Sequence, residues 1–187
     1  MENLKLVLRK KENPYKESSS IFELWGEFRL LYNDELLMDV EWDLTDFIRW
    51  FIDTKEFLKK ERFPFHFSNS IAESRDVLFE KVDDFSDSQE QEMFAYVDHL
   101  SEYFTKHYLH LKGTNTQEYY IGITPEGYGE ISCYTNNEYH AYLYDMDVFI
   151  KSTESEIEHF LKSMDIVEES KDFFKEMLTD YYPFLIS

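Results

Sequence analysis

Cysteine is almost absent from this chain, and lysine and arginine are scarce beside the acidic residues. Among 187 residues there is one cysteine, Cys133, and 19 Lys and Arg stand against 39 Asp and Glu, which gives a formal net charge of -20. A single cysteine excludes an intrachain disulfide and a zinc site with two thiolates. A protein that wraps nucleic acid needs cations to neutralise phosphates, so the charge argues against a nucleic-acid ligand.

Long apolar runs are also missing. Lys5 interrupts the apolar N-terminal stretch, which is too short for the hydrophobic region of a secretory signal. Elsewhere the apolar runs are only a few residues long, far below the roughly 20 residues that span a bilayer. Together with the single cysteine, this predicts a cytoplasmic protein with no membrane partner.

Large apolar and aromatic side chains are plentiful by contrast. Hydrophobic residues make up 43% of the chain and aromatic residues 18%, which is enough to build a core in spite of the charge. The length fits one domain, so we expect residues 1–187 to form a single α+β domain.

Two regions with a period of two flank a helical middle region. The ranges 4–8, 21–32 and 36–40 predict strands, with Asn33-Asp34 as the turn of an N-terminal hairpin. Between 117 and 145, breaks at 125–127 and 136–137 predict a three-strand meander. The fold prediction is one antiparallel sheet, made of this hairpin and meander, packed against about five helices.

The helices are predicted from apolar residues at helical spacing. Asp43 or Thr45 caps the first helix, and Ser70 opens the second. Thr153 and Glu156 stand at capping-box spacing, so we expect a helix to open at Ser152 or Thr153. The five predicted helices cover 45–62, 70–82, 94–108, 152–161 and 173–178.

The segment from 113 to 150 differs from the rest of the chain in charge and in aromatic content. It contains no Lys or Arg, six acidic residues and half of the chain's 14 tyrosines. Strand alternation assigns Ala141 and Leu143 to a core face together with Ile121, Ile123, Ile131 and Cys133. The other face is the predicted partner-binding site, which consists of Tyr120, Tyr128, Glu130, Tyr134, Glu138, His140, Tyr142 and Tyr144.

Tyrosine supplies large contact area and a hydroxyl at little entropic cost, so such a face suits a basic protein partner. An alternative interpretation remains open, in which helices cover this face and the tyrosines belong to the core.

No catalytic or metal motif accompanies these features. The glycines of Gly127-Tyr128-Gly129 lie between strands, so this segment predicts a hairpin turn and no phosphate loop. Glu156 and His159 form one Glu-x-x-His pair, but a di-iron bundle needs a second copy that the chain lacks. We therefore predict no catalytic residue, no metal and no cofactor.

The N-terminal third carries three short sequences that suggest a family. Trp25-Gly26-Glu27 lies on a predicted strand, Asn33-Asp34 at the hairpin turn and Trp42-Asp43-Leu44 at a helix entry. With the acidity and aromatic content, this layout resembles the bacterial immunity proteins that neutralise toxin domains. The resemblance implies a non-enzymatic inhibitor that masks a basic toxin or nuclease, with association accelerated roughly 10 to 1,000-fold by complementary charge.

Two other functions are compatible with the sequence. One is a DNA-mimic that occupies the nucleic-acid site of an enzyme, which requires carboxylates spaced like phosphates. The other is an enzyme on a small molecule, with Glu138, His140 and tyrosines as acid/base groups in a cleft.

Overall fold

The computed structural model describes residues 2–14 and 24–164. The predicted helix 173–178 and residues 21–23 of the second predicted strand lie outside the described residues. The chain divides into two compact units. Among the described residues, the meander unit comprises Thr54–His110 and Gln117–Met146, and the N-terminal unit comprises 2–14, 24–53, Leu111–Thr116 and 147–164.

An antiparallel three-stranded sheet forms the centre of the N-terminal unit. Its strands are β1 (Leu4–Lys10), β2 (Trp25–Tyr32) and β3 (Glu35–Asp43), in that order across the sheet. The turn between β2 and β3 consists of Asn33 and Asp34, which both have positive φ angles of 47° and 68°. Short polar side chains tolerate this conformation, and it suits a two-residue hairpin turn. The predicted N-terminal hairpin with an edge strand is confirmed.

Helix α1 (Thr45–Lys60) follows β3, as predicted. The Asp43 carboxylate accepts a hydrogen bond from the Thr45 amide at 3.0 Å, which satisfies a donor at the start of the helix. Phe47 on α1 lies edge-on against the fully buried Phe28 of β2, with ring centroids 4.9 Å apart. This aromatic contact fixes the start of α1 against the sheet.

Helix α4 (Met146–Ser163) begins earlier than predicted. Thr153 is fully buried inside the helix, so the predicted capping box with Glu156 is wrong. The apolar residues Phe149 and Ile150 extend the helical period backwards, and both are buried. Glu156 has another role, because its Oε1 accepts a hydrogen bond from the Leu8 amide of the edge strand β1 at 2.8 Å.

A second antiparallel sheet forms the meander unit. Its order is β4 (Tyr108–Leu109), β5 (Tyr119–Ile123), β6 (Gly129–Thr135) and β7 (Glu138–Tyr144). The three-strand meander is confirmed, and the short strand β4 adds to it. The prediction of one sheet is wrong, since the hairpin and the meander belong to separate sheets of three and four strands.

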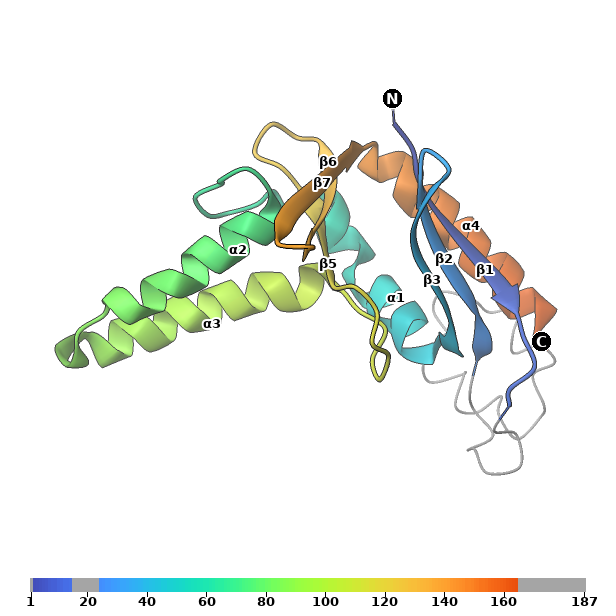
Figure 1. Ribbon diagram of the computed structural model, residues 1–187, viewed down its shortest axis with the longest axis horizontal. Helices are drawn as coiled ribbons and strands as arrows, with labels where there is room; N and C mark the ends of the chain where they lie inside the picture. The colour runs from blue at the N-terminus through green and yellow to red at the C-terminus, as the bar shows by residue number, and fades with distance from the viewer. Residues whose placement is uncertain (1, 15–23, 165–187) are drawn as a thin grey trace. The chain divides into compact units, whose positions relative to one another are not determined.

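Two antiparallel helices complete the meander unit, and their far ends extend away from its sheet (Figure 1). They are α2 (Ile71–Glu80) and α3 (Glu90–His107), joined by short 3-10 turns at Lys81–Asp84 and Asp87–Gln89. Ser70 caps α2, as predicted, by accepting a hydrogen bond from the Glu73 amide at 3.1 Å. Their shared core is apolar and includes Ile71, Ala72, Leu78, Leu100, Tyr103 and Phe104.

The α+β class is therefore confirmed, with four α-helices among the described residues. The assignment of residues 1–187 to a single domain stays a prediction. In the part of the chain that the structure describes, no helix combines the length and the apolar character that crossing a bilayer requires.

Candidate functional site

The β6–β7 hairpin pairs its residues in a register that the sequence analysis did not anticipate. Asn136 and Asn137 form a two-residue turn with φ angles of 52° and 63°. The turn pairs Thr135 with Glu138, and Ile131 with Tyr142. Directly opposed residues lie on the same face of a sheet, so an odd-numbered residue on β6 shares its face with an even-numbered residue on β7.

The predicted division of the sheet into two faces is consequently wrong for β7. His140 and Tyr142 share a face with Cys133 and Ile131, while Ala141 and Leu143 lie on the opposite face with Ser132 and Glu130. The error arose because strand alternation was applied without the constraint that a two-residue turn imposes.

The eight predicted site residues also differ in how far they are buried. Tyr120, Glu130 and Tyr144 are buried, with exposed fractions of 8%, 1% and 2%. Tyr128 and Tyr134 are exposed by 55% and 49%. Glu138 is exposed as well, whereas His140 and Tyr142 are half-buried. The eight residues therefore do not form one exposed face.

Helix α2 buries part of the predicted site. The Ile71 amide donates a hydrogen bond to the Glu130 carboxylate at 2.6 Å, and the Ala72 amide donates to the Ser132 hydroxyl at 3.0 Å. Burial raises the pKa of Glu130, and the hydrogen bond from Ile71 opposes that shift. A carboxylate at a helix N-terminus satisfies free amides and the helix dipole, so Glu130 positions α2 on the sheet.

Helix α3 is attached to the same face by a buried histidine that lies in the predicted helix 94–108. His107 is fully buried and stacks on Tyr103, with ring centroids 3.9 Å apart. Its Nδ1 lies 2.8 Å from the Ile121 carbonyl and its Nε2 3.2 Å from the Glu61 carboxylate. Burial lowers the pKa of His107. Since both nitrogens are occupied and no solvent reaches the ring, we assign His107 a structural role.

Gly122 is the sequence signal for this packing. A Cβ atom at Gly122 would lie 2.6 Å from the Tyr103 hydroxyl and 3.2 Å from His107 Nδ1. The absence of a side chain between the buried Ile121 and Ile123 therefore allows the α3 rings to approach the sheet.

Four tyrosines lie on the face that α2 and α3 partly cover, and we call them the tyrosine face. The register aligns Tyr108 with Tyr120, and Tyr120 with Ser132, while Tyr134 pairs with Tyr139. Tyr120 and Tyr134 of this set were predicted site residues. Tyr108 and Tyr139 were missed, since their positions depend on strand β4 and on the turn register.

The outer end of the tyrosine face is an exposed aromatic pair. The rings of Tyr134 and Tyr139 lie 4.8 Å apart, and Tyr139 is exposed by 38%. The Tyr139 hydroxyl donates a hydrogen bond to the Asp76 carboxylate of α2 at 2.9 Å. Burial and this bond raise the pKa of Tyr139 to about 12. The hydroxyl thus stays protonated at neutral pH and remains a donor.

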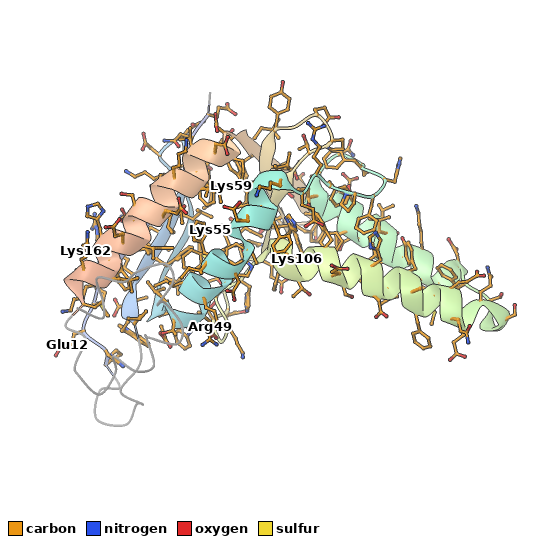
Figure 2. All side chains as sticks on the ribbon, turned by 180° about the vertical axis from the view of Figure 1, so that it is seen from behind. Glu12, Arg49, Lys55, Lys59, Lys106 and Lys162 are labelled. Carbon is orange, nitrogen blue, oxygen red and sulfur yellow. The ribbon has the colours of Figure 1, made fainter. Side chains whose placement is uncertain are left out.

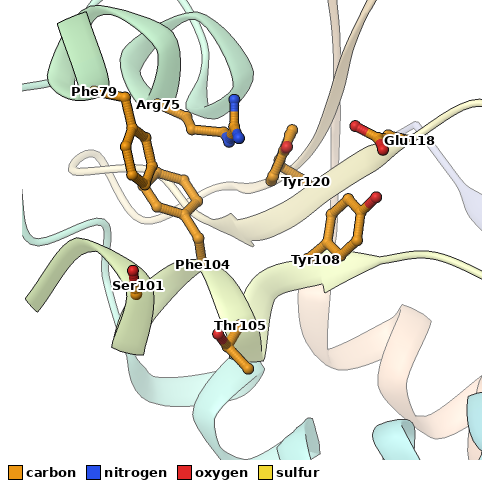
Figure 3. Close-up of a pocket in the computed structure, with 8 residues that line it drawn as sticks. All are labelled: Arg75, Phe79, Ser101, Phe104, Thr105, Tyr108, Glu118 and Tyr120. Carbon is orange, nitrogen blue, oxygen red and sulfur yellow. The ribbon is translucent and has the colours of Figure 1, made fainter. Parts of the chain in front are cut away.

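A pocket of about 410 Å³ adjoins the inner end of the tyrosine face (Figure 3). The Arg75 guanidinium lies over the rings of Phe79 and Tyr120, 5.0 and 5.4 Å from their centroids. Arg75 also pairs with Asp76 at 2.6 Å, which links the pocket to the Tyr134 and Tyr139 pair. The pocket is lined by Arg75, Phe79, Ser101, Phe104, Thr105, Tyr108, Glu118 and Tyr120.

Three other cations of the meander unit lie on helices and have acidic neighbours. Lys59 and Lys60 on α1 both pair with Glu56, and Lys106 on α3 pairs with Glu102. Figure 2 labels Lys59 and Lys106 on these helices. The strands β5, β6 and β7 contain no Lys or Arg. Negative charge on this sheet is therefore not neutralised from within its own strands.

The described residues contain no group of three or more His, Cys, Asp and Glu side chains that could hold a metal ion. Cys133 is buried, and burial raises the pKa of its thiol, which disfavours the reactive thiolate. No protein-family model, curated protein or solved structure matches the chain.

Proposed function

We propose that the chain is a non-enzymatic, acidic binding protein of the immunity type, which inhibits a basic protein by covering its cationic surface. The proposed contact is the outer end of the tyrosine face. The observation that carries this proposal is the exposed Tyr134 and Tyr139 pair, which lies on strands that contain no Lys or Arg.

The aromatic pair has the properties of an interface anchor. Two large rings in contact reduce each other's freedom before any partner binds, which lowers the entropic cost of association. The hydrogen bond from Tyr139 to Asp76 holds one ring in place further. Tyrosines of this kind supply a large share of the binding energy in many interfaces.

Charge supports a basic partner. The chain has a formal net charge of -20, and its segment 113–150 has six acidic residues and no Lys or Arg. Such a surface attracts a cationic protein and accelerates encounter, and the acceleration weakens as salt rises.

Co-expression with the products of neighbouring genes tests the proposal. We expect one of them, a basic protein, to co-purify with the chain at low salt and to dissociate at high salt. Replacement of both tyrosines, Tyr134→Ala with Tyr139→Ala, should abolish co-purification. Phe94→Ala is the matched control, because Phe94 is an aromatic residue on α3 that is exposed by 54%.

Two results would contradict the proposal. One is the absence of a complex with any neighbouring product. The other is a complex that the paired tyrosine replacement and the Phe94→Ala control weaken equally, because the tyrosine face would then have no special part in binding.

A further inference from the structure

The pocket beside the tyrosine face is lined by a carboxylate that forms no ion pair with any described residue. Glu118 is exposed, and none of the ion pairs found among the described residues includes it. Its neighbour is Tyr108, whose pKa is raised by burial, by a hydrogen bond with Glu118 and by the charge of Glu118. Arg75 is already paired with Asp76 at 2.6 Å. Glu118 is therefore the acidic residue of the pocket lining for which the described residues provide no ion-pair partner.

The pocket walls are aromatic faces, which attract cations. A cation within about 6 Å of a ring centroid gains from the negative charge of the ring face. Arg75 already uses the rings of Phe79 and Tyr120 in this way. The Tyr108 ring lies 5.4 Å from Tyr120, and in Figure 3 its hydroxyl end is turned toward Glu118. A second cation at the Glu118 side would meet the Tyr108 ring and a carboxylate together.

We infer that this pocket receives an arginine or lysine side chain of the partner protein, with Glu118 as its counter-charge and Tyr108 as its aromatic support. The inference rests on the proposed function, because it names a subsite of the same binding surface. Arginine is the better occupant, since its planar guanidinium stacks on rings and donates two parallel hydrogen bonds to a carboxylate.

Other occupants fit less well. An anionic group would face Glu118 and a chain with a net charge of -20, and the cation nearest to it, Arg75, is already paired. A neutral aromatic side chain would cover Glu118 without compensating its charge, and a carboxylate buried in this way costs free energy.

A small probe tests the inference without the partner. The amide resonances of Tyr108, Glu118 and Tyr120 are followed by NMR during titration with N-acetyl-arginine amide. The citrulline analogue is the neutral control of the same shape, and N-acetyl-phenylalanine amide tests a neutral aromatic occupant. We expect the arginine probe to bind about tenfold more tightly than either, because only it compensates Glu118.

Substitutions in the pocket test whether the arginine probe binds beside Glu118. Glu118→Gln should weaken binding of the arginine probe about tenfold, since it removes the charge and keeps the shape. Glu126→Gln is the matched control, because Glu126 is an exposed carboxylate in the same cation-free segment but does not line the pocket. Tyr108→Leu should also weaken binding, with circular dichroism as the check on folding.

The outcomes separate this inference from the proposed function. Equal binding of the arginine and citrulline probes, or an arginine affinity unchanged by Glu118→Gln, would overturn the cation subsite even if the partner complex forms. Binding of the arginine probe that depends on Glu118 would support the subsite even if no neighbouring gene product forms a complex.

Discussion

The two hairpins of this chain use the same kind of turn but carry different side chains. β2 and β3 are joined by Asn33 and Asp34, and β6 and β7 by Asn136 and Asn137, all with positive φ angles. Both turns leave the strands in a two-residue antiparallel register. The turns therefore do not distinguish the two hairpins. The β2–β3 pairing has a register shift between Leu30 and Leu31 that the β6–β7 pairing lacks, and the two hairpins present different side chains.

Ion pairs neutralise the first hairpin locally. Glu27 on β2 lies near Arg9 and Lys11 at 3.7 and 3.4 Å, and Arg29 pairs with Asp39 across the strands at 3.1 Å. The second hairpin instead has a pair of aromatic rings in contact, Tyr134 with Tyr139. The comparison teaches that charge alone does not mark a binding surface, because acidic residues that have cationic neighbours are already satisfied.

The largest effect should come from the buried side of the first hairpin. Phe28→Ala removes a fully buried ring that packs against Phe47, and we expect a loss of about 3–5 kcal/mol in the free energy of unfolding. Chemical denaturation measures it. Leu36→Ala on β3 is the control, because Leu36 is 46% exposed and should change stability by less than about 0.5 kcal/mol. Similar losses for both variants would show that the hairpin core is misplaced.

The second-largest effect should be a pH dependence of the free energy of unfolding. It should come from the buried carboxyl group of Glu130 on the second hairpin, and not from the paired surface carboxylates. Burial raises the pKa of Glu130, so the folded protein binds a proton more readily there than the unfolded chain does. Stability contributed by this group is present at low pH and is lost as pH rises from about 4.3, where an unfolded glutamate titrates, through the raised folded pKa.

Glu130→Gln removes this titration and keeps a hydrogen-bond acceptor for the Ile71 amide. We expect the stability of the variant relative to the original protein to increase as pH rises from about 4 to about 7. Denaturation at several pH values measures the difference. A difference that stays constant with pH would contradict the assignment of a buried carboxyl group with a raised pKa.

The contact between the Tyr134 and Tyr139 rings should contribute less to the free energy of unfolding, and its contribution should not depend on salt. A double-mutant cycle with Tyr134→Ala and Tyr139→Ala should give a coupling energy of about 0.5–1.5 kcal/mol, as is typical of ring pairs in contact. The same cycle in about 1 M NaCl should give the same value, since salt screens charges and not ring contacts. A coupling near zero would mean that the rings move independently.

The smallest effect should come from the ion pair of the first hairpin. The side chains of Arg29 and Asp39 are 33% and 41% exposed, so a cycle with Arg29→Ala and Asp39→Ala should give about 0.2–1 kcal/mol. We expect high salt to lower this coupling energy, because salt screens the two charges. A coupling larger than that of the tyrosine pair, or one that salt leaves unchanged, would reverse the contrast between the hairpins.

Much of the fold could be predicted from local sequence signals. Both Asn-containing turns, the Ser70 cap and the alternating strands act through neighbouring residues, and the structure confirms them. The start of α4 was missed because Phe149 and Ile150 follow a strand closely and were not included in the helical period. The separation into two sheets depends on contacts between distant parts of the chain, which no local pattern contains.

The candidate site was harder to predict, since it depends on which residues face each other. Glu130 looked like a surface carboxylate, but helix α2 covers it and the Ile71 amide of that helix donates a hydrogen bond to it. Tyr139 was missed because its face is decided by the register that the two-residue turn imposes, and not by the composition of β7. The pocket requires α2, α3, β4 and β5 together, so sequence spacing alone could not reveal it.

The most direct test of the central claim is the dissociation constant of the chain for its co-purifying basic partner, measured at two salt concentrations. We expect the paired replacement of Tyr134 and Tyr139 by alanine to weaken binding at least about tenfold at both. Phe94→Ala should leave it unchanged, and higher salt should weaken binding of every version. An affinity that the tyrosine replacements leave unchanged would contradict the account.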